Sequence, residues 1–526
     1  MRRGVLSVVL ALTFAAHQAQ AQHQHDASTG DYGSVKFRTS CSAAVQPAFG
    51  RAVAILHSFG YEKANAAFED ISREDPACAI AWWGVAMTYY HGLWEQIGPK
   101  EGHAAVEKAR AIANTNPKTT SRERDYIEAV GKIFDDLSMP LAGRELAYER
   151  AMAKLHATYP DDDEATIFYA LALDVDAPKT DKTYANQRKA RDLLVPIFKE
   201  QPNHPGLAHY IIHVSDYPPL AQDALDAARR YAKIAPASPH AQHMPSHIFT
   251  RLGLWDESIA SNLASAASAE RDEKTSHSNE AYNQRLHAMD YLEYAFLQEG
   301  RIEEARAIME LARSIRQKER LNNTGAYADA AIPARFAIER QDWKMAAALE
   351  PTTGVPANDA TTCYAKGVGA ALSGDVVAGM RAEAQLSAYG QQLAKAGDKY
   401  WSQQVEIERL QVLARVEQRE GKREEAFSHA RTAAEIEDST EKSPVTPGPI
   451  VPARENLAQM LLAEGWGKQA LMEFEAVLKV APARYNAVAG AQKSAASVGD
   501  PKAKFYSAQL DALQKKAVIQ DAVKPK

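Results

Sequence analysis

Apolar residues recur at helical spacing along most of the chain. In residues 301–309, Ala305 follows Ile302 by three residues, and Ile308 and Met309 follow Ala305 by three and four residues. This period places them on one face of an amphipathic helix. Alternating β-branched runs and Asn-Gly turns, which are typical of β-hairpins, are scarce in the sequence. The pattern therefore predicts an all-α protein.

The helices are predicted to come in repeated pairs. A glycine that ends one helix and starts the next recurs at Gly60, Gly253, Gly300, Gly421 and Gly465. A proline closes the second helix of several units, at Pro76, Pro160, Pro202, Pro236 and Pro482. Pro202 and Pro236 are 34 residues apart (236 − 202), which is the length of a helix–turn–helix repeat that stacks into a solenoid.

This period resembles that of the tetratricopeptide repeat (TPR) proteins, with Ala64 and Phe68 in one second helix and Ala426 and Phe427 in another. More narrowly, the chain is similar to a group of exported bacterial TPR proteins. Three stretches carry that similarity: Ala-x-Ala-Trp-Trp-Gly at 79–84, His-Met-Pro-Ser-His at 243–247 and Pro-Val-Thr-Pro-Gly-Pro at 444–449. The resemblance implies a right-handed superhelix with first helices along a concave groove, and it transfers no activity.

The repeats suggest a division of the chain into five segments. We expect a signal peptide (1–21), an N-terminal arm (22–45), a TPR-like domain (46–437), a proline-rich loop (438–452) and C-terminal TPR-like repeats with a final helix (453–526). The loop cannot be helical, and it is either a linker or a segment folded back over the groove. Gly253 and Gly300 lie 47 residues apart (300 − 253), which predicts a 13-residue insertion around 271–278.

The N-terminus predicts export. Arg2 and Arg3 precede a largely apolar run over 5–16 and an Ala-Gln-Ala step that ends at Ala21, the pattern of a cleaved signal peptide. We therefore expect a periplasmic or secreted protein without a membrane span. In an oxidising compartment Cys41 and Cys78 could form a disulfide, or all three cysteines could be buried thiols; Cys363 is expected in the core.

Charge and composition narrow the classes of partner. The 526 residues carry a formal charge of −6 with mixed signs, so a nucleic-acid partner is not expected. Phosphate-binding loops and the Gly-x-Ser-x-Gly nucleophile elbow do not occur in the sequence. The oligomeric state stays open.

Histidines provide the candidate chemistry. Of the 16 in the chain, eight lie between residues 204 and 287: His204, His209, His213, His240, His243, His247, His277 and His287. His209 and His213 are four apart, as are His243 and His247, and the two pairs are offset by the 34-residue repeat. Residues four apart share a helix face, so two packed helices can direct four imidazoles into one space.

The next repeat extends this face. Aligning Gly300 with Gly253 places His287 over His240, Asp290 over His243 and Tyr294 over His247. Imidazoles with an occasional carboxylate are ligands of zinc, copper or iron. We therefore predict a transition metal held by histidines, with the candidate ligands His209, His213, His240, His243, His247 and His287.

Two interpretations of this cluster remain. His287, Asp290 and Tyr294 are candidate catalytic groups if an open coordination position supports hydrolysis or oxidation of a small molecule in the groove, whereas a closed shell would be a structural or storage site. Alternatively, the protein is a non-catalytic scaffold whose groove docks a peptide, and the histidines contact that peptide or pack against neighbouring helices.

Overall fold

The computed structural model describes residues 31–94 and 96–523, so the predicted signal peptide lies outside the described residues. The first part of the chain forms helices α1 (Gln46–His57), α2 (Tyr61–Glu74), α3 (Ala79–Met87), α4 (Pro99–Thr115), α5 (Ser121–Phe134), α6 (Leu141–Thr158), α7 (Asp163–Val175) and α8 (Ala185–Glu200). Two short strands, β1 (Tyr90–His91) and β2 (Gln96–Ile97), pair antiparallel between α3 and α4.

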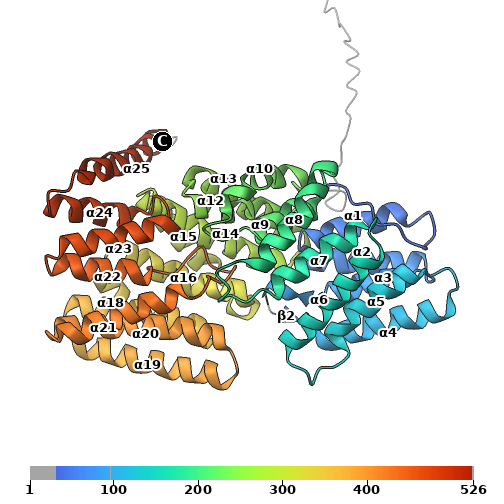
Figure 1. The fold of residues 1–526 in the computed structure, drawn as a ribbon, viewed down its shortest axis with the longest axis horizontal. Helices are drawn as coiled ribbons and strands as arrows, with labels where there is room; N and C mark the ends of the chain where they lie inside the picture. Colours follow the sequence, from blue (N-terminus) through green and yellow to red (C-terminus); the bar gives the residue numbers. More distant parts are fainter. Residues whose placement is uncertain (1–30, 95, 524–526) are drawn as a thin grey trace, which may run out of the picture.

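The central part consists of α9 (Pro205–His213), α10 (Leu225–Ile234), α11 (Pro239–His243), α12 (Pro245–Leu252), α13 (Trp255–Ser276), α14 (Asn279–Gln298), α15 (Ile302–Ile315) and α16 (Asn323–Glu339). The last part consists of α17 (Trp343–Ala347), α18 (Pro356–Ser373), α19 (Val376–Lys395), α20 (Lys399–Arg419), α21 (Arg423–Asp438), α22 (Ala453–Ala463), α23 (Gly467–Val480), α24 (Tyr485–Ser497) and α25 (Lys502–Val523). Successive helices stack side by side along the molecule (Figure 1).

Each helix pair buries an apolar face against its neighbours. In α2 the buried residues Ala64, Phe68 and Ile71 follow the three- and four-residue spacing that the sequence predicts. The Phe68 ring meets Phe49 of α1 edge to face, with 5.5 Å between ring centroids. Gly84 of α3 lies against the same ring, where a β-carbon would approach Phe68 Cδ1 to 2.4 Å. Small residues at such contacts allow the helices to stack closely, which is how a solenoid builds a continuous core.

The C-terminal repeats return to the middle of the chain. Gly253, which ends α12 with a φ of +67°, lies against the carbonyl of Pro482, and a β-carbon at this position would approach that oxygen to 2.5 Å. The Trp255 indole donates a hydrogen bond to the Ala483 carbonyl at 3.1 Å. The curvature of the solenoid therefore brings two turns more than 200 residues apart into contact.

The long interval between Gly253 and Gly300 is taken up by longer helices. Helix α13 has 22 residues and α14 has 20, and the turn between them falls at His277 and Ser278. The insertion predicted around residues 271–278 thus extends the pair by additional helical turns.

The proline-rich loop lies over the inside of the solenoid. Lys182 binds Glu441 at 2.7 Å, the Tyr184 hydroxyl donates to Glu441 at 2.7 Å, and the Tyr327 hydroxyl donates to Thr446 at 2.9 Å. Val445, Ile450 and Val451 are buried in the same apolar cluster as side chains of α16, α18 and α20. Of the two alternatives for this loop, the structure shows the folded-back one.

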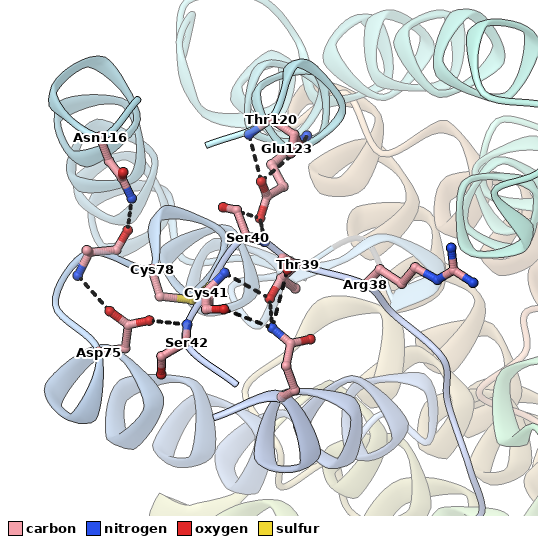
Figure 2. The surroundings of a disulfide bond; sticks show 12 residues. Arg38, Thr39, Ser40, Cys41, Ser42, Asp75, Cys78, Asn116, Thr120 and Glu123 are labelled. Carbon is pink, nitrogen blue, oxygen red and sulfur yellow. Dashed lines mark hydrogen bonds between the residues drawn. A yellow bond between two sulfur atoms is a disulfide. The ribbon is translucent and has the colours of Figure 1, made fainter. Parts of the chain in front are cut away.

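Cys41 and Cys78 are joined by a disulfide that fastens the N-terminal arm to the start of α3 (Figure 2). Around it, the Ser42 amide donates to Asp75 at 2.7 Å and the Ser40 amide to Glu123 at 2.8 Å. Cys363 is a buried free thiol in α18. The paired-cysteine alternative is therefore the one observed. Among the described residues, no helix is long and apolar enough to span a membrane.

The disulfide closes a 37-residue separation, and its loss should weaken the N-terminal part of the solenoid. We expect the Cys41→Ser/Cys78→Ser variant to lose about 2–4 kcal/mol of unfolding free energy, because the unfolded chain regains loop entropy. Chemical denaturation followed by tryptophan fluorescence measures this loss. Thiol titration of the unreduced, denatured wild type should find one free thiol per chain, and three would contradict the disulfide.

Candidate functional site

Six of the eight clustered histidines converge inside the solenoid and form two groups. The first triad consists of His209 and His213 from α9 and His240 from α11; the second consists of His243 from α11, His247 from α12 and His287 from α14. Within each triad, the potential ligand atoms all lie within 4.8 Å of one another. All six side chains are buried, between 0% and 7% exposed.

The local sequence explains how these helices present their histidines. Pro205 and Pro239 occupy the first turns of α9 and α11. Backbone N–H groups in the first turn have no acceptor within the helix, so proline, which lacks this group, fits there. Pro245 starts α12 two residues after α11 ends at His243, and Met244 between the two helices keeps right-handed helical backbone angles (φ −53°, ψ −35°). His243 and His247 still share a face, and their Nε2 atoms are 3.0 Å apart.

A hydrogen bond from outside the first triad fixes the orientation of His209, the ring that lies between His213 and His240. His209 Nδ1 lies 2.6 Å from the backbone carbonyl of His57, which can only accept, so Nδ1 carries the proton of the neutral ring. His209 Nε2 then presents a lone pair to the Nε2 atoms of His213 and His240, each at 3.0 Å. A backbone or carboxylate partner behind a ligating imidazole is the usual arrangement in metal sites.

The second triad is oriented in the same way, by side chains. His247 Nδ1 donates to the Asp216 carboxylate at 2.9 Å, and His243 Nδ1 donates to Asn262 Oδ1 at 2.7 Å. The Asn262 amide nitrogen donates to the Ser258 carbonyl, which directs its oxygen toward His243. Both Nδ1 atoms therefore carry protons, and two Nε2 lone pairs face each other across 3.0 Å.

Burial keeps these imidazoles neutral. It lowers the pKa of both His209 and His287 to about 3. Burial, together with neighbouring imidazoles, also lowers the pKa values of His213, His240 and His243 well below their usual range. For His247, burial outweighs the opposing effect of Asp216, so its pKa is lowered as well. Neutral imidazole is the form that binds metal ions.

The two triads lie side by side. Between them, the His213 and His247 ring centroids are 6.2 Å apart, as are those of His240 and His243. Ring pairs within a triad are 4.4 to 6.4 Å apart, so the spacing between the triads falls in the same range. The six rings therefore form one continuous cluster.

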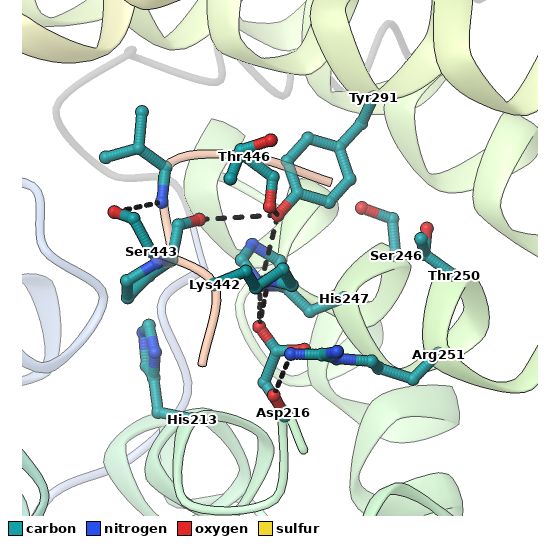
Figure 3. Close-up of polar contacts among 12 residues, drawn as sticks. His213, Asp216, Ser246, His247, Thr250, Arg251, Tyr291, Lys442, Ser443 and Thr446 are labelled. Carbon is teal, nitrogen blue, oxygen red and sulfur yellow. Dashed lines mark hydrogen bonds and ion pairs between the residues drawn. The ribbon is translucent and has the colours of Figure 1, made fainter. Parts of the chain in front are cut away.

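Asp216 connects this cluster to the proline-rich loop. Its carboxylate accepts hydrogen bonds from His247 at 2.9 Å, Arg251 at 2.8 Å and Lys442 of the loop at 2.7 Å (Figure 3). Although burial alone would raise the pKa of Asp216, Lys442, Arg251 and His247 together hold it well below its usual range. The ionised carboxylate therefore orients His247 and holds the loop at the same time.

Tyr291 is the other link between loop and cluster. Its hydroxyl donates to the Thr446 carbonyl at 3.0 Å and lies 3.4 Å from His247 Nδ1 (Figure 3). Its ring also lies against His243, with 4.7 Å between ring centroids. Tyr291 follows His287 by one helical turn of α14, so it lies on the same face.

The other predicted site residues lie elsewhere. Asp290 is buried in an ion pair with Arg335, and the Tyr294 hydroxyl accepts a hydrogen bond from Arg484 at 3.4 Å. His277 is exposed in the turn between α13 and α14. His204 belongs to a separate buried group in which Glu164 binds both His57 and His204 at 2.8 Å. In that group each imidazole is therefore already paired with one oxygen of the Glu164 carboxylate.

A cavity of about 290 Å³ adjoins the first triad at His213. Asp216, Lys442 and Asp174 also line it. Asp174 Oδ1 is buried and has no hydrogen-bond partner among the described residues, and burial raises the pKa of Asp174 to about 7. Because His213 and these polar side chains line the cavity, it can hold a small polar molecule next to the histidine cluster.

Several residues of the site were not predicted from the sequence: Asp216, Asn262, Tyr291, Lys442 and His57. Asp216 directly follows the turn that ends α9, three residues after His213, and Tyr291 lies four residues after His287. Both spacings could have suggested them. Asn262, Lys442 and His57 come from other repeats and have no such signal.

Comparison with known proteins finds solved structures of low similarity. No protein-family model and no curated protein matches the chain. Among solved structures, human IFIT1 as a dimer with PPP-AAAA is 12% identical, with a TM-score of 0.38 over 85% of this chain and 89% of that one. Yeast Tom70 is 9% identical, with a TM-score of 0.31 over 85% and 87%. The stacked helix pairs of the structure itself confirm the predicted all-α, TPR-like helical solenoid.

If Tyr291 holds the loop over the cluster, removing its hydroxyl should loosen the loop. The Tyr291→Phe variant loses hydrogen bonds to two loop carbonyls, Pro444 and Thr446. We expect the free energy of local opening to fall by about 1–2 kcal/mol, so amide exchange in residues 443–448 should become roughly 5–30 times faster. Hydrogen exchange with mass spectrometry measures it, with Tyr506→Phe as the control. Unchanged exchange would show that other contacts hold the loop.

Proposed function

We propose that the histidine cluster binds a transition metal, zinc, copper or iron, and that the protein is a metal-dependent small-molecule-binding protein or enzyme with hydrolytic or oxidative chemistry. The protein would act in the periplasm or outside the cell. The disulfide between Cys41 and Cys78 supports an oxidising compartment.

The contact between His243 and His247 carries this proposal. Both rings use their Nδ1 protons on acceptors behind them, so the Nε2 atoms meet as two lone pairs at 3.0 Å. Facing lone pairs in a buried site repel each other, and a cation between them converts both into ligands. His287 supplies a third nitrogen to the same group, and its Nδ1 has no hydrogen-bond partner among the described residues.

The composition of the triads bears on metal and chemistry. Both consist of imidazoles alone, a ligand set that suits zinc, copper and iron better than magnesium or calcium. Three protein ligands per ion leave at least one coordination position for water or substrate, as in catalytic zinc sites. A small molecule in the cavity beside His213 would lie close to that position.

The surrounding groups would then have distinct roles. We assign His287 the role of a ligand, and the Tyr291 hydroxyl is the phenol that lies against the second triad. Asp290 and Tyr294, predicted as candidate catalytic groups, bind Arg335 and Arg484 and would act only at a distance. Peptide docking onto these histidines is less well supported, because all six are buried beneath neighbouring helices and the loop.

Metal analysis of protein purified without a histidine tag tests the proposal. We expect at least one zinc, copper or iron ion per chain, and a His243→Ala/His247→Ala variant should lose half of its metal or more, because two facing ligands are removed. His277→Ala, which changes an exposed histidine, should keep the full content. Wild-type protein that stays metal-free after incubation with each of these ions and dialysis would contradict the proposal.

A further inference from the structure

We propose that the two triads hold two metal ions as a pair, and that this pair binds one small anion shared between the ions. This inference rests on the proposed function and adds the number of ions and the chemical class of the ligand.

Each triad has enough donors for an ion of its own. Three imidazoles per ion is the protein ligand set of a catalytic zinc site. In each triad at least one ring is oriented from behind by an oxygen acceptor, such as the His57 carbonyl for His209 and the Asp216 carboxylate for His247. A single ion could not be reached by all six rings, because the ligand atoms fall into two separate groups of three.

The two ions would be close enough to share a ligand. Rings of different triads approach to 6.2 Å between centroids at two points, His213 with His247 and His240 with His243. These approaches are no longer than the His247–His287 separation of 6.4 Å within the second triad. Pairs of ions about 3.5–4 Å apart bind both ends of one bridging group in many enzymes.

Charge determines what the bridge would be. Six neutral imidazoles leave the full positive charge of both ions uncompensated inside a buried cluster. The Asp216 carboxylate, which contacts His247, already forms ion pairs with Arg251 and Lys442. Its negative charge is therefore balanced by these two cations and does not neutralise the metal ions. A small anion such as hydroxide or azide would lower the net charge where the two ions meet, and Lys442 and His213 line the cavity through which it could arrive.

Metal stoichiometry tests the pair. After loading with excess Cu(II) or Co(II) and dialysis, we expect two ions per chain by elemental analysis. His209→Ala/His213→Ala and His243→Ala/His247→Ala should each retain one, and His277→Ala should retain two. His213→Gln and His247→Gln, which keep more side-chain volume, serve as second variants if an alanine pair fails to fold by circular dichroism.

The outcomes separate this inference from the proposed function. Two ions in the wild type and one in each double variant support the pair. One ion in the wild type that either double variant removes would keep the proposed function and overturn the pair. No bound ion would overturn both.

Azide titration tests the shared anion. With the fully loaded Co(II) or Cu(II) protein, we expect saturation at one azide per two ions, followed by its absorption band. A double variant that retains a single ion should bind azide at least tenfold more weakly, because the second cation is missing. Two azides per wild-type chain, each bound as tightly as the single azide of a double variant, would overturn the shared ligand.

Discussion

Six buried imidazoles can converge only if something determines where each ring places its proton. In this protein that role falls to oxygen acceptors behind the rings: the His57 carbonyl, the Asn262 amide oxygen and the Asp216 carboxylate. They hold three Nδ1 protons away from the centre, so lone pairs point inward. A ring turned over by loss of its acceptor would present an N–H to the cluster instead. The chemistry proposed for the site depends on this constraint.

The solenoid supplies the acceptors from different repeats. His57 ends α1, Asn262 lies in α13, and Asp216 follows α9. Asp216 is also the point at which the proline-rich loop is attached through Lys442, so the same carboxylate orients a candidate ligand and closes the inside of the solenoid. An open groove would expose the rings to water and raise their affinity for protons. The loop therefore contributes to the site although only its lysine and backbone approach it.

Repeat spacing was sufficient to predict the helical solenoid and the six converging histidines, because both follow from local periodicity. The third repeat shows where this reasoning ends. Its alignment placed Asp290 and Tyr294 beside the second triad, yet Tyr291 lies there. Tyr291, one helical turn after His287, lies against His243 and His247, whereas Asp290 and Tyr294 bind Arg335 and Arg484. The boundary between the two triads falls between His240 and His243, which both lie in α11, and the spacing does not reveal it.

The sequence could not reveal which ring each orienting partner contacts, and the reason is a different one. Asn262 is 19 residues from His243, Asp216 is 31 from His247, and His57 is 152 from His209. Such pairs are brought together by packing between repeats. Two contacts between distant segments were nevertheless among the alternatives that the sequence offered. These are the proline-rich loop over the groove and the disulfide of the N-terminal arm, and the structure contains both.

The most direct test of the account is a crystal structure of metal-loaded protein with anomalous diffraction recorded at the absorption edge of the bound metal. The account predicts anomalous peaks inside the solenoid, each bonded at about 2.0–2.1 Å to the inward nitrogens of one triad. Peaks confined to other parts of the chain, or an occupied cluster in which His243 and His247 are not ligands, would contradict it.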